Sequence, residues 1–159
     1  MTSIYLIGSL RNPRVTEVAA ELRSYGWDVF DDWMAAGPEA DDYWLKYEKE
    51  KGVSMTDALK SYAAKHVFEF DKYHLDRCDM AVLLLPAGKS GHLEIGYMAG
   101  KGKSTFALFD SEPERWDVMY QFLTGVAFDT ASLIDLIKAE ELRIWPYTSV
   151  YENRRKELA

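Results

Sequence analysis

The feature that most constrains the fold is an uninterrupted run of six apolar residues, Met80 to Leu85, near the middle of the chain. A strand with one face in water alternates apolar and polar residues, whereas a strand covered on both faces is apolar throughout. The run therefore predicts a central strand of a parallel sheet with helices on both faces. Pro86 and Gly88 end this strand, and residues 91–101 then show the spacing of a helix.

The rest of the chain alternates between strand and helix patterns in the same way. A length of 159 residues with 48% hydrophobic residues suits a single globular domain over residues 1–159. The alternation predicts an α/β fold, a doubly wound parallel sheet of about five strands of the flavodoxin or Rossmann-like kind. The expected strands are residues 4–7, 27–30, 80–85, 105–109 and 125–128, and the expected helices are residues 13–25, 41–47, 56–77, 91–101, 117–123 and 130–142.

Charge and composition exclude several classes of partner. The net charge is −7, from 26 acidic and 19 basic residues, and the longest basic run is Arg154 to Lys156, so nucleic acid is not expected to bind. No apolar segment reaches membrane length and the amino end has no signal-peptide pattern, so no membrane partner is expected. Cys78 is the single cysteine, which excludes an internal disulfide. We expect a soluble, cytoplasmic protein.

Glu94 follows the central strand and is expected in the first turn of the next helix. Open α/β sheets bind ligands beyond the carboxyl ends of their strands, which is where this carboxylate would lie. An acidic residue in the first turn can also simply cap the helix. The small, polar segment from Gly88 to His92 favours a ligand site, because a cap needs no such loop. Within the helix, Gly96 and Gly100 are expected to approach the sheet closely.

Other polar groups follow the first two strands. Residues Gly8 to Arg11 precede a helix and could bind an anionic or hydroxyl group through their backbone, although the full dinucleotide pattern is absent. Asp31 to Trp33 follow the second strand. Two neighbouring acids could bind a metal, but no further ligand lies at a suitable spacing, so no metal is expected. No cofactor is expected either.

Carboxylates remain as the candidate catalytic groups. The histidines have no serine partner in a nucleophile motif, and the Walker pattern is absent. Asp71 is expected near the carboxyl end of the long helix, where the helix dipole disfavours a negative charge. Glu94 and Asp71 could form the acid pair that glycosyl transfer uses, one as nucleophile and one handling a proton.

These motifs together resemble the nucleoside 2-deoxyribosyltransferase family, which includes related nucleotide N-glycosidases. The resemblance covers about residues 3–119, and it identifies the chain as a single domain of that kind. It rests on Tyr5, the segment Gly8 to Arg11, Asp71 eight positions before Asp79, and the segment Ser90 to Gly96. It implies that Glu94 attacks C1′ of the sugar with retention, that Asp71 contacts the base and assists its protonation, and that Tyr5 positions Glu94.

The departures from the family pattern concern the 5′ end of the substrate. Six residues before the nucleophile, deoxyribosyltransferases tend to carry aspartate and nucleotide hydrolases serine, whereas this chain has Gly88, with Ser90 nearby. Asp117 resembles a second 5′ contact that comes from a neighbouring subunit, and it would repel a phosphate. Arg11 and Arg14 could instead pair with a phosphate. The balance favours a free nucleoside, with hydrolysis of 5′-monophosphates or a non-catalytic nucleotide sensor as alternatives.

The resemblance also implies a homodimer or larger homo-oligomer with shared sites. The aromatic tail, residues 145–151, is expected to form a dimer surface or to pack on its own domain. Residues 35–62 are expected to form a lid or a surface helix, with Trp33 and Trp44 as candidates for stacking on the base. No residue decides whether the sugar passes to a base or to water. The expected substrate-binding residues are Gly8, Ser9, Arg11, Asp32, Trp33, Gly88, Ser90, His92 and Asp117.

Overall fold

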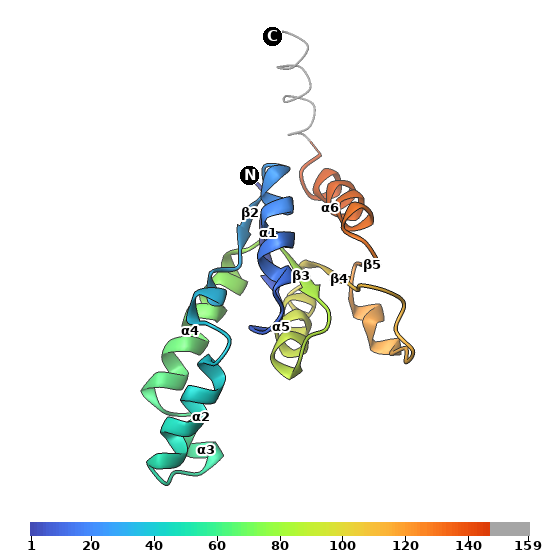
Figure 1. Ribbon diagram of the computed structural model, residues 1–159. Helices are drawn as coiled ribbons and strands as arrows, with labels where there is room; N and C mark the ends of the chain where they lie inside the picture. Colours follow the sequence, from blue (N-terminus) through green and yellow to red (C-terminus); the bar gives the residue numbers. More distant parts are fainter. Residues whose placement is uncertain (147–159) are drawn as a thin grey trace.

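The computed structural model of the protein describes residues 1–146, and its centre is a five-stranded parallel sheet in the order β2-β1-β3-β4-β5 (Figure 1). The predicted fold class, an α/β domain with a doubly wound parallel sheet, is confirmed. The order changes direction between β1 and β3, and this switch point is where open parallel sheets bind ligands. The strands are β1 (Ser3–Ile7), β2 (Asp28–Phe30), β3 (Met80–Leu84), β4 (Ser104–Leu108) and β5 (Gly125–Ala127).

The central strand β3 is buried along its whole length, as its apolar run predicts. It pairs in parallel with β1 on one side and with β4 on the other. Its alternate residues enter two separate cores: Val82 packs with one set of side chains and Leu83 with the other. Burial on both faces fixes the register of this strand, since a slip of one residue would move every side chain to the opposite core.

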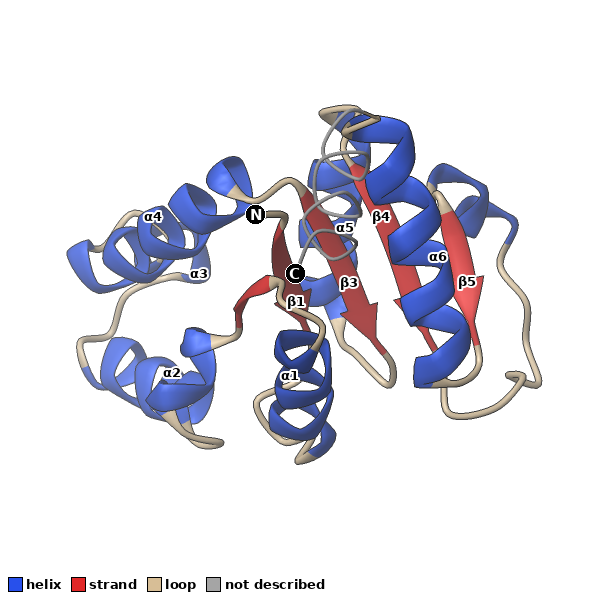
Figure 2. Ribbon diagram, turned by 90° about the horizontal axis from the view of Figure 1, so that it is seen from above, coloured by secondary structure: helices blue, strands red, loops and turns tan. Residues whose placement is uncertain are grey.

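Helices cover both faces of the sheet (Figure 2). On one face, buried residues of α1 (Arg14–Ser24) and α6 (Thr130–Ile144) pack with Ile4 and Leu6 of β1. On the other face, residues of α4 (Tyr62–Arg77) and α5 (Lys89–Gly100) pack with the alternate residues of β1. Tyr5 therefore points toward α4 and α5. The shorter elements are α2 (Ala40–Glu50), α3 (Met55–Ala58) and the 3-10 helices η1 (Asp32–Ala36) and η2 (Val118–Phe122).

The prediction of one continuous helix over residues 56–77 is wrong. The chain forms the short helix α3 and then α4, and Ser61 caps the start of α4 by accepting a hydrogen bond from the Ala64 N–H at 3.2 Å. The expected apolar face is largely uncovered, because Tyr62 is 92% exposed and Val67 59%. We call α2, α3 and the first two turns of α4 the helical arm, residues 40–69, which projects from the sheet (Figure 1). The helical spacing of apolar residues predicted helical structure in this segment, but it could not predict that the apolar face would be exposed.

The close approach of α5 to the sheet occurs at Gly91 and not at Gly96 or Gly100, so that prediction is also wrong. A Cβ atom added at Gly91 would lie 3.0 Å from Leu83 Cδ1 and 3.2 Å from Ile7 Cγ2, whereas one added at Gly96 would meet nothing within 4 Å. The helix begins at Lys89, two residues earlier than expected, and this brings Gly91 into its first turn against the sheet.

Three expectations drawn from the composition and the tail can be compared with the described residues. None of the helices in residues 1–146 combines the length and the apolar character needed to cross a bilayer. Cys78, between α4 and β3, is buried, and burial raises the pKa of its thiol to about 11. Most of the predicted aromatic dimer surface, from residue 147 onward, lies outside the described residues.

The glycine contacts predict opposite effects for two substitutions in α5. Gly91→Ala should lower the free energy of unfolding by about 1–3 kcal/mol, because the methyl group would press on Leu83, Ala87 and Ile7. Gly96→Ala should raise it by about 0.5–1 kcal/mol, since alanine is the better helix former and the position is open. Urea unfolding of both variants measures these changes. Equal effects would show that α5 does not approach the sheet at Gly91.

Candidate functional site

Three side chains meet between the sheet and the helices α4 and α5. Tyr5, in the middle of β1, is 1% exposed, and the carboxyl groups of Glu94 and Asp71 are near enough to its hydroxyl for both to raise the pKa of the phenol. Glu94 comes from α5 and Asp71 from α4, and both are half-buried. The structure therefore brings together the three residues that sequence reasoning named as catalytic. Their roles remain a prediction.

Burial and mutual repulsion govern the protonation of this group. Burial raises the pKa of Glu94 to about 7, helped by the negative charge of Asp71 and opposed by the hydrogen bond from Tyr5. Burial also raises the pKa of Asp71. The pKa of the Tyr5 phenol is raised far above its usual value by burial and by both carboxylates, so Tyr5 stays protonated and donates. The two carboxyls titrate as a pair that binds one proton over part of the neutral range.

Glu94 is not a helix cap. It is the sixth residue of α5, and no acidic residue occupies the first turn of that helix, so the expected first-turn position is wrong. Its carboxylate is also not neutralised, because no basic group within residues 1–146 contributes to its pKa shift. A carboxyl group with neither a capping role nor an ion-pair partner is a strong candidate for ligand binding or catalysis.

Asp71 is likewise free of a structural role at a helix end. It lies in the middle of α4, six residues before Arg77, so the expected position near the carboxyl end of the helix is wrong. Its Oδ1 atom is buried and has no hydrogen-bond partner among the described residues. Buried carboxylate oxygens are nearly always hydrogen-bonded, so this unpaired atom has no evident structural role and marks Asp71 as a functional candidate.

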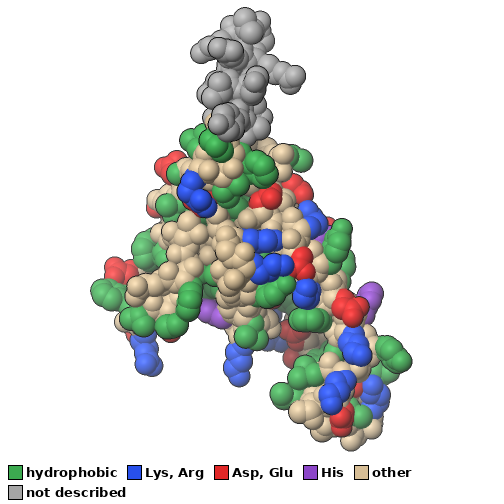
Figure 3. Space-filling view, turned by 180° about the vertical axis from the view of Figure 1, so that it is seen from behind, with side chains coloured by type: hydrophobic (Ala, Val, Ile, Leu, Met, Phe, Trp, Pro, Cys, Tyr) green, Lys and Arg blue, Asp and Glu red, His purple; other side chains and the backbone are tan. Residues whose placement is uncertain are grey.

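A hollow of about 460 Å³ lies at the switch point between β1 and β3, and none of Tyr5, Asp71 and Glu94 lines it. The guanidinium of Arg11, which lines the hollow, pairs with Asp42 of the helical arm at 2.5 Å. Gly88 at its edge precedes α5, so the hollow and Glu94 are separated by six residues, or about 9 Å along the helix axis. The space-filling surface is also indented between the helical arm and the sheet (Figure 3). The hollow is lined by Ser9, Arg11, Asn12, Pro13, Pro86, Ala87 and Gly88.

Gly8 and Trp33 form one wall near the hollow. A Cβ atom at Gly8 would lie 2.9 Å from Val15 Cγ2 and 3.6 Å from the Trp33 ring, so only glycine fits without displacing α1. The Trp33 indole N–H donates to the Leu6 carbonyl at 2.9 Å, and the ring packs against both cores. Trp33 is thus held as part of the frame, which leaves only its exposed edge for a ligand.

The remaining predicted binding residues lie on several elements, and some already have partners within the protein. Ser90, in the first turn of α5, and Asp32, at the start of η1, are exposed. His92 is tied down, with Nδ1 2.9 Å from the Gly88 carbonyl oxygen and Nε2 2.9 Å from the Tyr120 hydroxyl. Asp117 caps η2 by accepting from the Met119 N–H at 2.8 Å, and its expected role in a neighbouring subunit stays a prediction.

Sequence reasoning did not identify Asn12 as a functional residue. Its Oδ1 accepts from the Arg14 N–H at 3.0 Å, at the start of α1. Its Nδ2 is buried without a partner among residues 1–146, while the side chain lines the hollow. Its position in the loop that follows β1, directly before Pro13, is the sequence feature that could have identified Asn12.

Within the described part of the chain, no three His, Cys, Asp or Glu side chains are grouped to hold a metal ion.

The raised pKa of Glu94 predicts a pH-dependent stability. Since folding raises this pKa from 4.5 to about 7, folding favours the protonated form, and the stability it contributes is lost as the pH rises through that window. Glu94→Gln should match the wild type at about pH 4.5 and exceed it by up to about 3 kcal/mol at about pH 8. Urea unfolding at both pH values measures this difference. Glu17→Gln, an exposed site on α1, is the control, and a destabilised Glu94→Gln at about pH 8 would contradict the assignment.

Comparison with known proteins supports the fold. No family model matches the chain, and no characterised protein matches it in sequence. A 2-deoxyribosyltransferase from the psychrotolerant bacterium Bacillus psychrosaccharolyticus has a similar structure, with a TM-score of 0.58 and 18% identity over 83% of this chain and 90% of that one. The CMP N-glycosidase BcmB of Clostridium botulinum gives 0.52 and 14%, over 87% and 99%.

A conserved protein from Enterococcus faecalis gives a TM-score of 0.57 and 16% identity, over 88% of this chain and 99% of that one. At these identities the likeness shows a shared fold. The fold that the motif resemblance implies is therefore confirmed: this chain folds as a 2-deoxyribosyltransferase and a CMP N-glycosidase do.

Proposed function

We propose that the protein is an enzyme that cleaves the N-glycosidic bond of nucleosides and transfers 2-deoxyribose to another nucleobase. The observation that carries this proposal is the pair of carboxyls, Glu94 and Asp71, joined by Tyr5 and free of basic partners. Retaining glycosyl transfer needs two such groups, one as nucleophile and one to handle a proton. The names of two proteins with this fold, a 2-deoxyribosyltransferase and a CMP N-glycosidase, support the same bond as the target.

In the proposed first step, a Glu94 carboxylate oxygen attacks C1′ of the sugar as the bond from C1′ to the base nitrogen breaks. The electron pair of that bond passes to the base, which takes a proton from Asp71. A covalent glycosyl-enzyme results. In the second step a nitrogen of a new base attacks C1′, the bond to Glu94 breaks and its electron pair returns to the carboxylate, and Asp71 takes a proton from the incoming base. Two inversions at C1′ give overall retention.

The two carboxyls can share one proton, so that one is ionised and the other can donate. Attack by Glu94 requires that proton to lie on Asp71, whereas in the free protein the negative charge of Asp71 favours the protonated form of Glu94. The Tyr5 phenol, which stays protonated, contacts both groups and holds Glu94 in place through a hydrogen bond. Because Tyr5 is fixed within β1, the nucleophile is oriented by the sheet itself. Such preorganisation reduces the entropic cost of bringing the reacting atoms together.

The hollow at the switch point is the proposed site for the 5′ end of the substrate. It begins where α5 begins, and Glu94 lies further along the same helix, so a ligand in the hollow would extend toward the carboxyl pair. The contact between Arg11 and Asp42 joins this hollow to the helical arm. We propose that the arm, which includes most of the predicted lid (residues 35–62), covers the base and limits the access of water.

A second candidate function is hydrolysis of nucleoside 5′-monophosphates. Asn12 favours it, because this residue lines the hollow and its buried Nδ2 has no partner among the described residues, so a small rotation of the side chain would let it donate to a phosphate oxygen. Gly88 places no negative charge there. Against it, the one guanidinium that lines the hollow, that of Arg11, already pairs with Asp42 among the described residues. The third candidate, a non-catalytic nucleotide sensor, would bind its ligand without releasing any base.

Removal of the nucleophile is the direct test. A panel of nucleosides and 5′-monophosphates is incubated with and without an added free base, and the products are separated by chromatography. We expect base release and exchange by the wild type, and a loss of at least about 1,000-fold in Glu94→Gln, since no covalent intermediate can form. Glu17→Gln should retain full activity. Tight nucleoside binding by calorimetry without base release would instead identify a sensor, and unchanged activity of Glu94→Gln would exclude this role.

The 5′ group of the substrate is tested at Arg11. For a free nucleoside, Arg11→Met should leave kcat/KM within about twofold, because the guanidinium is paired with Asp42 and meets no charge on the ligand. A 5′-monophosphate should be the poorer substrate of the wild type. Steady-state kinetics with a nucleoside and its 5′-monophosphate measure both the effect of Arg11→Met on kcat/KM and the preference between the two substrates. A preference for the monophosphate that falls about tenfold or more in Arg11→Met would assign the hydrolase function.

A further inference from the structure

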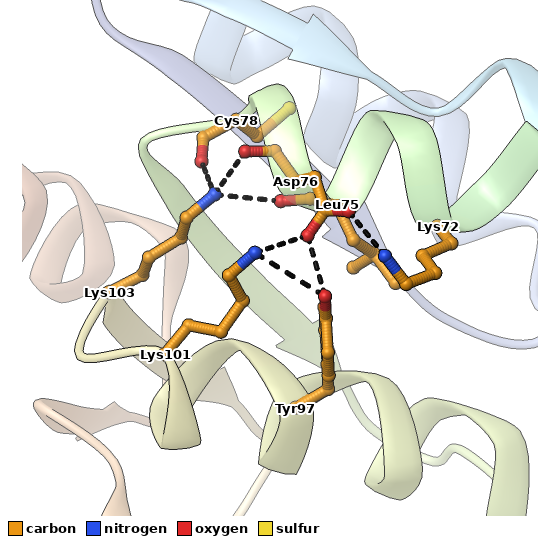
Figure 4. Close-up of polar contacts among 7 residues, drawn as sticks. All are labelled: Lys72, Leu75, Asp76, Cys78, Tyr97, Lys101 and Lys103. Atoms are coloured by element: carbon orange, nitrogen blue, oxygen red, sulfur yellow. Dashed lines mark hydrogen bonds and ion pairs between the residues drawn. The ribbon is translucent and has the colours of Figure 1, made fainter.

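A polar cluster joins α4 to α5 one turn beyond the carboxyl pair (Figure 4). Asp76 of α4 is its centre: its Oδ1 accepts from the Tyr97 hydroxyl at 2.6 Å and from Lys101 Nζ, and its Oδ2 accepts from Lys72 Nζ at 2.7 Å. Tyr97 and the chain just after α5 thus hold the last turns of α4. We call Lys72, Asp76, Tyr97 and Lys101 the Asp76 cluster.

A further lysine secures the end of α4. Lys103 Nζ donates to the backbone carbonyls of Leu75, Asp76 and Cys78, at 2.9, 2.6 and 2.7 Å (Figure 4). The last carbonyls of a helix have no partner within the helix and carry its negative dipole end, so a cation here satisfies both. Lys101 and Lys103 therefore attach the end of α4 to the turn that follows α5.

These polar contacts matter because apolar packing of α4 is sparse. Of the sixteen residues of α4, all of them described, Leu75 alone is fully buried. Helices are normally held in place by a buried apolar face. Toward β2, α4 has other anchors, since His74 stacks on Phe30 at 3.8 Å and Arg77 pairs with Asp28 at 3.0 Å. Toward α5, Leu75 packs in the same core as Ile95 and Met98, and the Asp76 cluster adds the polar contacts between the two helices.

We propose that Asp76 and Tyr97 are positioning residues that set the separation of the two carboxyl groups at the active site. Tyr97 follows Glu94 by three residues on α5, about 4.5 Å along the axis, and Asp76 follows Asp71 by five residues on α4, about 7.5 Å. A helix is rigid over such distances, so a bond between Asp76 and Tyr97 also fixes Asp71 relative to Glu94. Where it concerns catalysis, this inference rests on the proposed glycosyl transfer.

The charges of the cluster keep it assembled. Hydrogen bonds from Lys101, Lys72 and Tyr97 hold the pKa of Asp76 well below its usual range, so the carboxylate remains ionised at neutral pH. Around Glu94, the titratable groups are Asp71 of α4 and Tyr5 of β1. The repulsion from Asp71 raises the pKa of Glu94, and Coulomb repulsion weakens with distance. The pKa of Glu94 thus reports the separation of α4 and α5 without any need for turnover.

The test is Tyr97→Phe, which removes one hydroxyl and no apolar surface. The carboxyl carbons of 13C-labelled glutamate are titrated by NMR, and the Glu94 signal is identified by its loss in Glu94→Gln. We expect a wild-type pKa of about 7 and a pKa lower by about half a unit or more in Tyr97→Phe. In kinetics, kcat should fall about tenfold or more while KM changes less than about twofold, because geometry at the reacting atoms is lost and binding is kept.

Arg143→Met, which removes an exposed ion pair with Glu140 within α6, is the matched control and should leave the Glu94 titration unchanged. An unchanged titration in folded Tyr97→Phe overturns the inference whatever the rates, and so does an equal shift in Arg143→Met. A lowered pKa in a protein that releases no base supports the positioning and rejects the proposed function. If Tyr97→Phe fails to fold, Lys101→Met is used instead, because it removes another hydrogen bond to the Asp76 carboxylate. The Glu94 titration of that variant then supports or overturns the inference in the same way.

Discussion

The proposed site depends on two carboxyl groups kept near each other in a partly buried space, with no cation between them among the described residues. Burial and repulsion both disfavour two negative charges at Glu94 and Asp71. The neighbouring Tyr5 relieves this only in part, since a phenol can donate but cannot neutralise charge. Such an arrangement persists only if the surrounding frame is stable. The frame is the sheet, in which β1 and β3 are buried along their whole length.

Helix α5 combines the parts of the site. Gly88 at its start borders the hollow, Gly91 presses its first turn against the sheet, Glu94 carries the proposed nucleophile, and Tyr97 reaches α4. One rigid element therefore fixes the distance between the hollow, the proposed place for the 5′ end, and the proposed nucleophile. Helix α4 supplies the second carboxyl and is held mainly by polar contacts. The position of α5 is therefore set mainly by its close packing on the sheet, and the position of α4 mainly by polar contacts.

Much of this arrangement could be predicted from the sequence, because it follows from local patterns. The apolar run 80–85 predicts the central strand, Glu94 and Asp71 stand out as candidate carboxylates, and the resemblance to the 2-deoxyribosyltransferase family adds Tyr5. What could not be predicted depends on contacts between distant residues. The break before Tyr62 and the exposure of Val67 have no periodic signal, since an apolar helical face looks the same whether or not anything covers it. The Asp76 cluster likewise becomes visible only when α4 and α5 are placed together.

Cys78 can serve as a natural probe of local opening at the junction of α4 and β3. This single thiol lies at the junction of α4 and β3, it is 1% exposed, and its carbonyl accepts from Lys103. Burial raises its pKa to about 11, so at neutral pH there is almost no thiolate to react with an alkylating reagent. Reaction requires the end of α4 to leave the sheet. The alkylation rate of the unmodified protein therefore measures how often that junction opens. No engineered label is needed for this measurement.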